Sequence, residues 1–204
     1  MLHILNHPLG AHLITQLRDR TTEPAVFRTL CYRLGLLLTL EATRDLPTQP
    51  RVVETPLETH TGRELAQSLA VIPILRAGLG LLEPFTDLFP DVSVGYVGLE
   101  RDHATALAHS YYQKLPPLAG KRVLVVDPML ATGGSAVLAL NALLAAGATD
   151  LTLVCIVAAP EGVKVVEIAH PAVPIFTAAL DRELNEKKYI LPGLGDFGDR
   201  LYGT

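Results

Sequence analysis

The chain has 204 residues, of which 49% are hydrophobic and 19% are charged, and its formal net charge is −4. This balance excludes a disordered chain, which is poorer in apolar residues, and it offers no broad basic surface for nucleic acid. Two cysteines, Cys31 and Cys155, are too few to staple a secreted domain, so we expect buried thiols in a reducing compartment. No signal-peptide pattern and no apolar run of about 20 residues is visible, so we expect a soluble, cytoplasmic protein without membrane contact.

Helical periodicity dominates residues 11–46, where apolar residues recur at spacings of three and four. Thr22 is the expected N-cap of the main helix, and Pro24 fits its first turn. Two prolines end this region. The stretch 51–59 then predicts an extended arm outside the core.

Strands and helices alternate from residue 69 onward. Apolar runs predict strands at 69–75, 92–99, 123–127, 151–159 and 173–180. Helix-like segments separate several of them, at 81–89, 135–146 and 161–170. Continuous aliphatic strands are typical of a mainly parallel α/β sheet flanked by helices on both faces. We expect one domain over 1–204, with helices and arm at 1–60, a core at about 61–180 and a C-terminal hood at about 181–204.

Two segments, 101–117 and 185–204, show no helical or strand period and no face that would pack. In open parallel sheets, ligands bind at the carboxyl ends of the strands with loops over them. We therefore expect both segments to border the site, and the first to form a lid that excludes water. Its aromatic and charged residues are Arg101, Tyr111, Tyr112 and Lys114.

The strongest local signal is VLVVDPMLATGGSAVLALNALLAAG at 123–147. A buried strand ends in Asp127, and Thr132-Gly133-Gly134-Ser135 leads into a helix. Glycines let main-chain N–H groups approach an anion, the helix N-terminus is partly positive, and two hydroxyls can donate. A carboxylate beside such a cradle suits sugar hydroxyls or a hydrated Mg²⁺, so we expect a sugar phosphate and not a nucleoside triphosphate. The alternative is an ordinary strand–turn–helix whose glycines serve packing.

Two weaker signals accompany the cradle. Arg76 follows the predicted strand 69–75, so it would face the same crevice and bind a diphosphate bidentately, with Gly78 allowing main-chain contacts. The alternative is a solvated or salt-bridged arginine. The glycine-dense tail 189–204 predicts a rigid loop that contacts a flat ligand through its main chain, and the alternative is a frayed terminus.

Five stretches carry a family resemblance: PILRAGLG, VVDPMLATGGS, VAAPEG, LNE at 184–186, and PGLGD. With HPL at 7–9 and YGT at 202–204, the sequence resembles uracil phosphoribosyltransferases along its whole length. The resemblance implies a phosphoribosyltransferase-type fold with a β-arm and a small hood. It implies transfer of the 5-phosphoribosyl group from phosphoribosyl pyrophosphate to uracil, giving UMP and pyrophosphate. It further implies Mg²⁺ arriving with the diphosphate, a homodimer or larger homo-oligomer, and a GTP effector as in some members.

The resemblance also assigns roles to residues. The phosphoribosyl pyrophosphate contacts would be Arg76, Arg101, Asp127, Pro128, Met129, Leu130, Ala131, Thr132, Gly133, Gly134, Ser135 and Asp196. The uracil contacts would be Ile190, Gly195, Asp196 and Phe197. The catalytic set would be Arg76, Arg101, Asp127 and Asp196, with Asp196 or a water accepting the uracil proton. No metal site made by the protein itself is expected, because a single acid stands at Asp127-Pro128 where many phosphoribosyltransferases have two.

Main-chain groups suffice to select uracil. A carbonyl at Ile190 would accept from N3–H of the base, and amides in 195–197 would donate to an oxygen. Cytosine reverses two of these groups, which leaves buried polar atoms unpaired at about 1–3 kcal/mol each. Phe197 stands where the family often has alanine, and its ring would narrow the pocket if it pointed inward.

Two other functions remain open: a transferase of the same fold for another base, and an RNA-binding regulatory relative. The acidic net charge argues against the RNA-binding relative. We expect the histidines to lie on the surface and Glu161 to be a solvated helix position.

Overall fold

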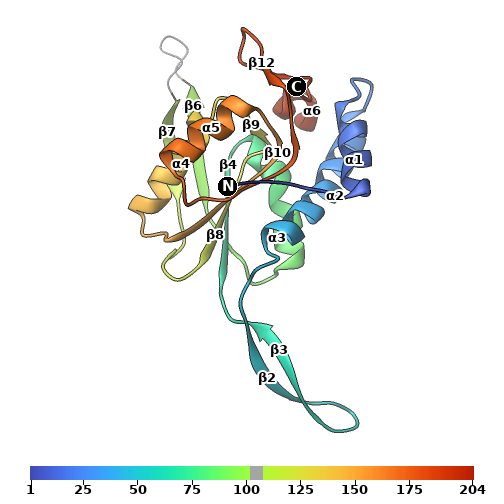
Figure 1. The fold of residues 1–204 in the computed structure, drawn as a ribbon, viewed down its shortest axis with the longest axis vertical. Helices are drawn as coiled ribbons and strands as arrows, with labels where there is room; N and C mark the ends of the chain where they lie inside the picture. Colours follow the sequence, from blue (N-terminus) through green and yellow to red (C-terminus); the bar gives the residue numbers. More distant parts are fainter. Residues whose placement is uncertain (102–107) are drawn as a thin grey trace.

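A computed structural model describes residues 1–101 and 108–204, with the side chains of 100, 101 and 108–110 left aside. The centre of the expected lid, 102–107, lies outside the described residues. Strands of the central sheet lie in the order β1-β11-β10-β8-β4-β6-β7 (Figure 1). In that order their bounds are Leu2–Ile4, Ile175–Leu180, Asp150–Ala158, Arg122–Val126, Leu69–Leu75, Tyr96–Arg101 and Ala108–Lys114. Neighbours pair in parallel except β6 and β7, which are antiparallel.

Two short strands extend the sheet. β5 (Ser93–Val94) pairs with the start of β4, and β9 (Met129–Leu130) pairs with the end of β10. The predicted strand 92–99 is therefore two strands, β5 and β6, which pair with β4 in the same register on either side of Gly95. A Cβ at Gly95 would lie 2.7 Å from Ile72 and 2.8 Å from Pro116, so the packing at this interruption favours glycine.

Alternate residues of the central strands enter two hydrophobic cores. Val71, Leu124 and Ile156 pack toward α1 (Pro8–Arg18), α2 (Pro24–Ala42) and α3 (Leu82–Leu88). Ile72, Val125 and Cys155 pack toward α4 (Gly134–Ala145) and α5 (Pro160–Ala169) on the other face (Figure 1). Both faces of the sheet are thus covered, which explains the continuous aliphatic runs and confirms the predicted parallel sheet. Cys31 and Cys155 are buried free thiols.

The N-terminal helices differ in detail from the prediction. Residues 11–46 contain two helices, and the N-cap of α2 is Glu23 instead of Thr22. Pro24 occupies the first helical position, which holds the preceding residue in an extended conformation and fixes the boundary there. The Thr22 hydroxyl donates to the Gln16 carbonyl at 2.7 Å instead. No helix in the described part of the chain is both long and apolar enough to cross a membrane.

The arm is a hairpin of β2 (Thr48–Glu54) and β3 (Thr59–Leu65), whose strands pair antiparallel and extend away from the sheet (Figure 1). The predicted stretch 51–59 covers only its distal part. Sequence patterning missed the second strand because THTGREL has no apolar alternation, and in the structure this strand is mostly exposed.

The polar stretch 108–114, expected to lack regular structure, forms β7. This strand lies at the edge of the sheet, and the side chains of Tyr111 and Tyr112 are largely exposed. An exposed edge strand needs no apolar run, which is why the sequence showed no strand period.

The C-terminal segment is packed, contrary to the expectation of a segment without a packing face. β12 (Glu183–Leu184) pairs with β13 (Ile190–Leu191), and α6 (Phe197–Tyr202) follows. Leu194, Phe197 and Leu201 join the core beneath α1 and α2. Only Phe197 and Leu201 share a helix, α6, and a pattern of two apolar residues is too short to stand out in the sequence. The alternative of a frayed terminus is therefore wrong.

Candidate functional site

The cradle begins where β8 ends, at the carboxyl edge of the sheet. Asp127 follows Val126, and its N–H bonds to the Val154 carbonyl at 3.1 Å. β9 and a short loop lead to Gly133, which is the N-cap of α4 and has φ of +81°. The strand, the loop and the helix N-terminus thus follow one another as predicted.

The two cradle glycines serve different purposes. A Cβ at Gly133 would lie 2.8 Å from the Gly162 carbonyl and 3.0 Å from Val165, so its φ and its packing both require glycine. A Cβ at Gly134 would meet nothing closer than the Thr132 hydroxyl at 3.9 Å. The packing explanation therefore holds for Gly133, while Gly134 keeps open space beside the helix N-terminus.

A small cavity of about 40 Å³ lies inside the cradle. Its lining residues are Asp127, Met129, Leu130, Ala131, Thr132, Gly133, Ser135 and Ala136. Burial raises the pKa of Asp127 to about 7, and the main-chain N–H of Met129 offsets part of the rise. A carboxyl with such a pKa is half protonated near neutrality, so hydrogen-bond donors or a cation from a ligand would favour its charged form.

Arg76 stands beyond the end of β4 and precedes the 3₁₀ helix η1 (Ala77–Leu81). It is exposed, and within the described part of the chain no carboxylate lies at salt-bridge distance from it. Its carbonyl accepts from the Tyr202 hydroxyl at 3.1 Å, which joins this loop to α6. A Cβ at Gly78 would lie 2.5 Å from the Val126 carbonyl, so this glycine lets η1 pack on β8.

A second cavity, of about 330 Å³, adjoins the cradle. Its lining comprises Ala77, Met129, Ala131, Lys187, Lys188, Tyr189, Ile190, Gly195, Asp196, Phe197 and Gly198. The residues predicted to contact uracil all line it. Met129 and Ala131 line both cavities, so the structure brings the cradle and the tail to one site.

The tail loop depends on glycine at two positions, Gly193 (φ +62°) and Gly195 (φ +79°). A Cβ at Gly193 would lie 2.2 Å from the Ile190 carbonyl. These constraints fix a sharp turn, and residues 195–198 at its end line the cavity. Asp196 then caps α6, with Oδ1 accepting from the Asp199 N–H at 3.0 Å.

The Phe197 ring packs in the core instead of pointing into the larger cavity. It is 2% exposed and stacks edge to face on Phe27, with ring centroids 5.3 Å apart. The ring therefore belongs to the core, and Phe197 forms part of the wall of the larger cavity.

Other predicted positions had mixed outcomes. Arg101 ends β6, and its side chain lies outside the described residues. Glu161 is not merely solvated: its Oε1 accepts from the Leu184 N–H at 2.9 Å, and this bond lowers the pKa of Glu161. The bond connects α5 to the C-terminal hood. In the sequence, Glu161 was marked only by its place in the VAAPEG stretch. His170 is buried instead of lying on the surface, because it ends α5 against the core.

The described residues contain no group of three histidine, cysteine, aspartate or glutamate side chains placed to hold a metal ion. Asp127 is the carboxylate that lines the small cavity. A single carboxylate is a poor match for a divalent cation, which takes six or more oxygen ligands. The residues present therefore fit a cation whose oxygen ligands come mainly from a substrate and from water.

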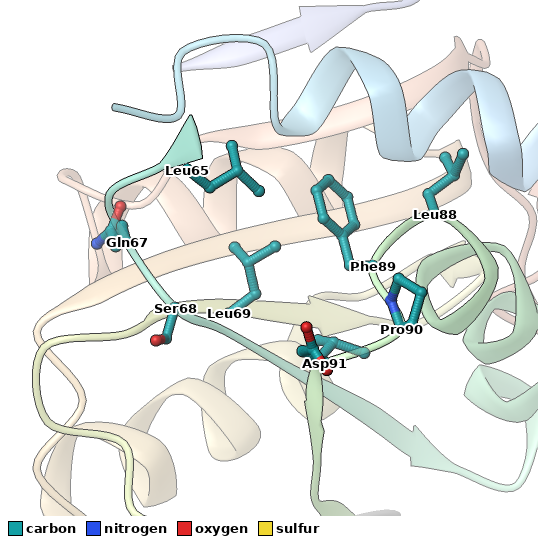
Figure 2. Close-up of a pocket in the computed structure, with 9 residues that line it drawn as sticks. Leu65, Gln67, Ser68, Leu69, Leu88, Phe89, Pro90 and Asp91 are labelled. Atoms are coloured by element: carbon teal, nitrogen blue, oxygen red, sulfur yellow. The ribbon is translucent and has the colours of Figure 1, made fainter. Parts of the chain in front are cut away.

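A separate cavity of about 270 Å³ lies near the amino end of β4, at the base of the arm. Figure 2 shows the side chains of Leu65, Leu69 and Phe89 converging on it. Leu69 begins β4, whereas Arg76 follows its end, so this cavity is not part of the cradle.

Comparison with known proteins agrees with this geometry. A family model described as uracil phosphoribosyltransferase matches residues 4–204. The chain is 52% identical over 202 residues to the uracil phosphoribosyltransferase of Roseiflexus castenholzii, covering 98% of this chain and 97% of that protein. It is 50% identical over 205 residues to that of Halalkalibacterium halodurans, covering 100% and 98%.

Solved structures show the same fold. A protein from Aquifex aeolicus superimposes with a TM-score of 0.95 at 39% identity, covering 100% of this chain and 99% of that one. A phosphoribosyltransferase from Corynebacterium diphtheriae, at 19% identity, shares the fold with a TM-score of 0.55 over 85% of this chain and 96% of that one. The parallel sheet, the cradle and the full-length match together show that this chain belongs to the uracil phosphoribosyltransferase family.

Proposed function

We propose that this site transfers the 5-phosphoribosyl group of phosphoribosyl pyrophosphate to uracil, giving UMP and pyrophosphate for pyrimidine salvage in the cytoplasm. The observation that carries the proposal is the meeting of two cavities. The small cavity inside the cradle and the larger cavity bordered by the tail share Met129 and Ala131. A base bound in the larger cavity would therefore lie next to a sugar held by the cradle.

The sugar phosphate would occupy the loop from Asp127 to Ser135. Main-chain N–H groups at the start of α4 and the Thr132 and Ser135 hydroxyls would bind the 5-phosphate. The Asp127 carboxylate would accept from ribose hydroxyls, and those donors would lower its raised pKa and keep it charged. Arg76 and Arg101 would bind the diphosphate. Arg76 is exposed and follows the carboxyl end of β4, on the same side of the sheet as the cradle.

Uracil would be read by main-chain groups in the larger cavity. The Ile190 carbonyl would accept from N3–H, and the amides of Gly195, Asp196 and Phe197 would donate to a base oxygen. Gly195 supports this role because it has left-handed backbone geometry and lines the cavity without a side chain. Cytosine would leave two groups unpaired, at about 1–3 kcal/mol each.

The transfer breaks the bond between ribose C1 and the diphosphate oxygen and forms a bond from C1 to uracil N1. Negative charge grows on the leaving diphosphate, where the arginines would stabilise it, while the cradle holds C1 in reach of the base. We propose that Mg²⁺ arrives with the diphosphate and helps to neutralise it. Asp196 is the candidate acceptor of the N1 proton through Oδ2, because Oδ1 caps α6; a water is the alternative.

We also propose that the chain forms a homodimer or larger assembly through the arm and the helices of 11–46. In support, the arm carries exposed apolar side chains, with Leu57 95% and Val52 65% exposed. A cavity lined partly by apolar side chains, Leu65, Leu69 and Phe89 among them, also lies at the base of the arm (Figure 2). A GTP effector is proposed from the family resemblance alone, and activity measured with and without GTP tests it.

A pyrophosphate-release assay across uracil, cytosine, orotate, adenine and hypoxanthine tests the function. We expect turnover with phosphoribosyl pyrophosphate and uracil, dependent on Mg²⁺. Turnover with another base but not with uracil would reject the assignment, and removal of Mg²⁺ with EDTA should abolish release.

A further inference from the structure

The loop that borders the base cavity is held by three charged side chains that do not line that cavity. They are Arg18 at the end of α1, Asp181 directly after β11, and Arg200 in α6. None of them belongs to the cradle either. Their hydrogen bonds converge on the main chain of two consecutive residues, Gly193 and Leu194.

Asp181 connects the loop to the sheet. Its own N–H bonds to the Ala158 carbonyl at 2.8 Å, so its position is set by β10 and β11. Its carboxylate is buried, with a residue exposure of 7%. Oδ2 accepts from the Gly193 N–H at 2.8 Å, and both oxygens accept from Arg18, at 2.5 Å and 2.8 Å.

Arg18 completes a closed ring of bonds. Its Nη1 donates to Asp181 and also to the Gly193 carbonyl at 2.9 Å. The N–H and the carbonyl of one glycine are therefore fixed by the two members of one ion pair. A charge pair that is largely buried and bidentate resists rearrangement better than a surface pair does.

Arg200 fixes the next residue. Its guanidinium donates to the carbonyls of Leu194 at 2.8 Å and of Asp19 at 2.6 Å, and also to that of Leu17. It lies over the Phe27 ring, 4.5 Å from the centroid. The loop is thus attached to the N-terminal helices immediately before the residues that would contact the base.

We propose that the Arg18–Asp181 pair is a positioning device that sets the affinity and selectivity for the base without touching it. Gly193 has left-handed backbone geometry, and glycine gives up more conformational freedom on ordering than any other residue. With both of its main-chain groups fixed, the amides of 195–197 are ordered before the base binds. Without the pair, the loop would become ordered only when the base binds, and the cost of that ordering would weaken the binding of the base. The inference rests on the proposed function of the cavity.

The test compares Asp181→Asn and Arg18→Lys with wild type in steady-state kinetics. The amide of Asn keeps one acceptor but loses the charge, and Lys keeps the charge but loses the two-pronged geometry. We expect each variant to raise KM for uracil about tenfold or more, with KM for phosphoribosyl pyrophosphate and kcat within about twofold. We also expect the preference for uracil over cytosine to fall, because a disordered loop discriminates less.

Asp150→Asn is the matched control. The Asp150 carboxylate also accepts from an arginine, Arg122, at 2.9 Å, but both residues lie at the amino ends of their strands, β10 and β8. The Asp150→Asn variant should therefore leave both KM values unchanged. The positioning role would be overturned if Asp181→Asn and Arg18→Lys both kept KM for uracil within about twofold of wild type. It would also be overturned if they raised KM for uracil and KM for phosphoribosyl pyrophosphate equally. If Asp181→Asn does not fold, Arg18→Lys alone decides between these outcomes.

Wild type in the same assay separates the two proposals. Normal uracil turnover by wild type with unchanged variants contradicts only the positioning role. No uracil turnover by wild type contradicts the proposed function, and the positioning role with it.

Discussion

Replacing Asp127 by asparagine should stabilise the protein at high pH while removing most of its activity. Burial raises the pKa of this carboxyl from its ordinary 3.8 to about 7. The native state therefore keeps the proton over a pH range in which the unfolded chain has already released it. The stability contributed by the protonated carboxyl is complete below about pH 4, falls as pH rises, and is lost once pH passes 7.

The magnitude follows from the width of that range. Each pH unit between the two pKa values changes the free energy of unfolding by about 1.4 kcal/mol. From pH 5 to pH 8, two such units apply, because both states are ionised above pH 7, which gives at most about 2.8 kcal/mol. The Asp127 side chain is only half-buried at the cavity surface, so solvent reduces this value, and we expect about 1–2 kcal/mol.

The assay is urea unfolding of wild type and Asp127→Asn at pH 5 and pH 8, at one fixed protein concentration. The free energy of unfolding of wild type should fall by about 1–2 kcal/mol more than that of the variant between pH 5 and pH 8. Asp91→Asn, at an exposed carboxylate, is the control and should follow wild type. Parallel stability curves for wild type and Asp127→Asn would refute the raised pKa. Near-normal turnover by the variant would refute a role of this carboxylate in binding ribose.

Three further substitutions test separate parts of the site. Gly134→Val should fold, because a Cβ there meets open space, yet raise KM for phosphoribosyl pyrophosphate about tenfold or more; unchanged KM would argue against the cradle. Phe197→Ala should lower the free energy of unfolding by about 3–5 kcal/mol in urea, since its ring packs on Phe27, and a loss below about 1 kcal/mol would contradict that packing. Tyr202→Phe should raise KM for phosphoribosyl pyrophosphate about twofold to tenfold, because it removes the hydrogen bond to the Arg76 carbonyl. An unchanged KM would show that this bond does not position the loop that carries Arg76.

The sequence could predict the elements whose cause is local. Aliphatic runs placed β4, β8, β10 and β11 to within about two residues, because a strand covered on both faces must be apolar throughout. The cradle was predictable for the same reason, since its strand, glycines and helix are contiguous. The roles of its residues, like those of the tail, remain predictions that the kinetic tests address.

Features that depend on distant partners could not be predicted. Arg18 and Asp181 are 163 positions apart, and neither lies in a motif that marks the other. Glu161 resembles any solvated helix residue until Leu184 is placed beside it. The orientation of the Phe197 ring depends on its contact with Phe27. Strand β7 lies at the edge of the sheet, and its polar sequence gives no strand pattern.

The wall shared by the two cavities, Met129 and Ala131, has a consequence for inhibitor design. A nucleoside monophosphate would anchor at its base and at its phosphate simultaneously, so the second attachment becomes intramolecular, as in a chelate. An analogue whose base and sugar are joined by an unreactive carbon–carbon link should therefore bind far more tightly than either fragment alone. Cutting that link should cost more affinity than trimming either end.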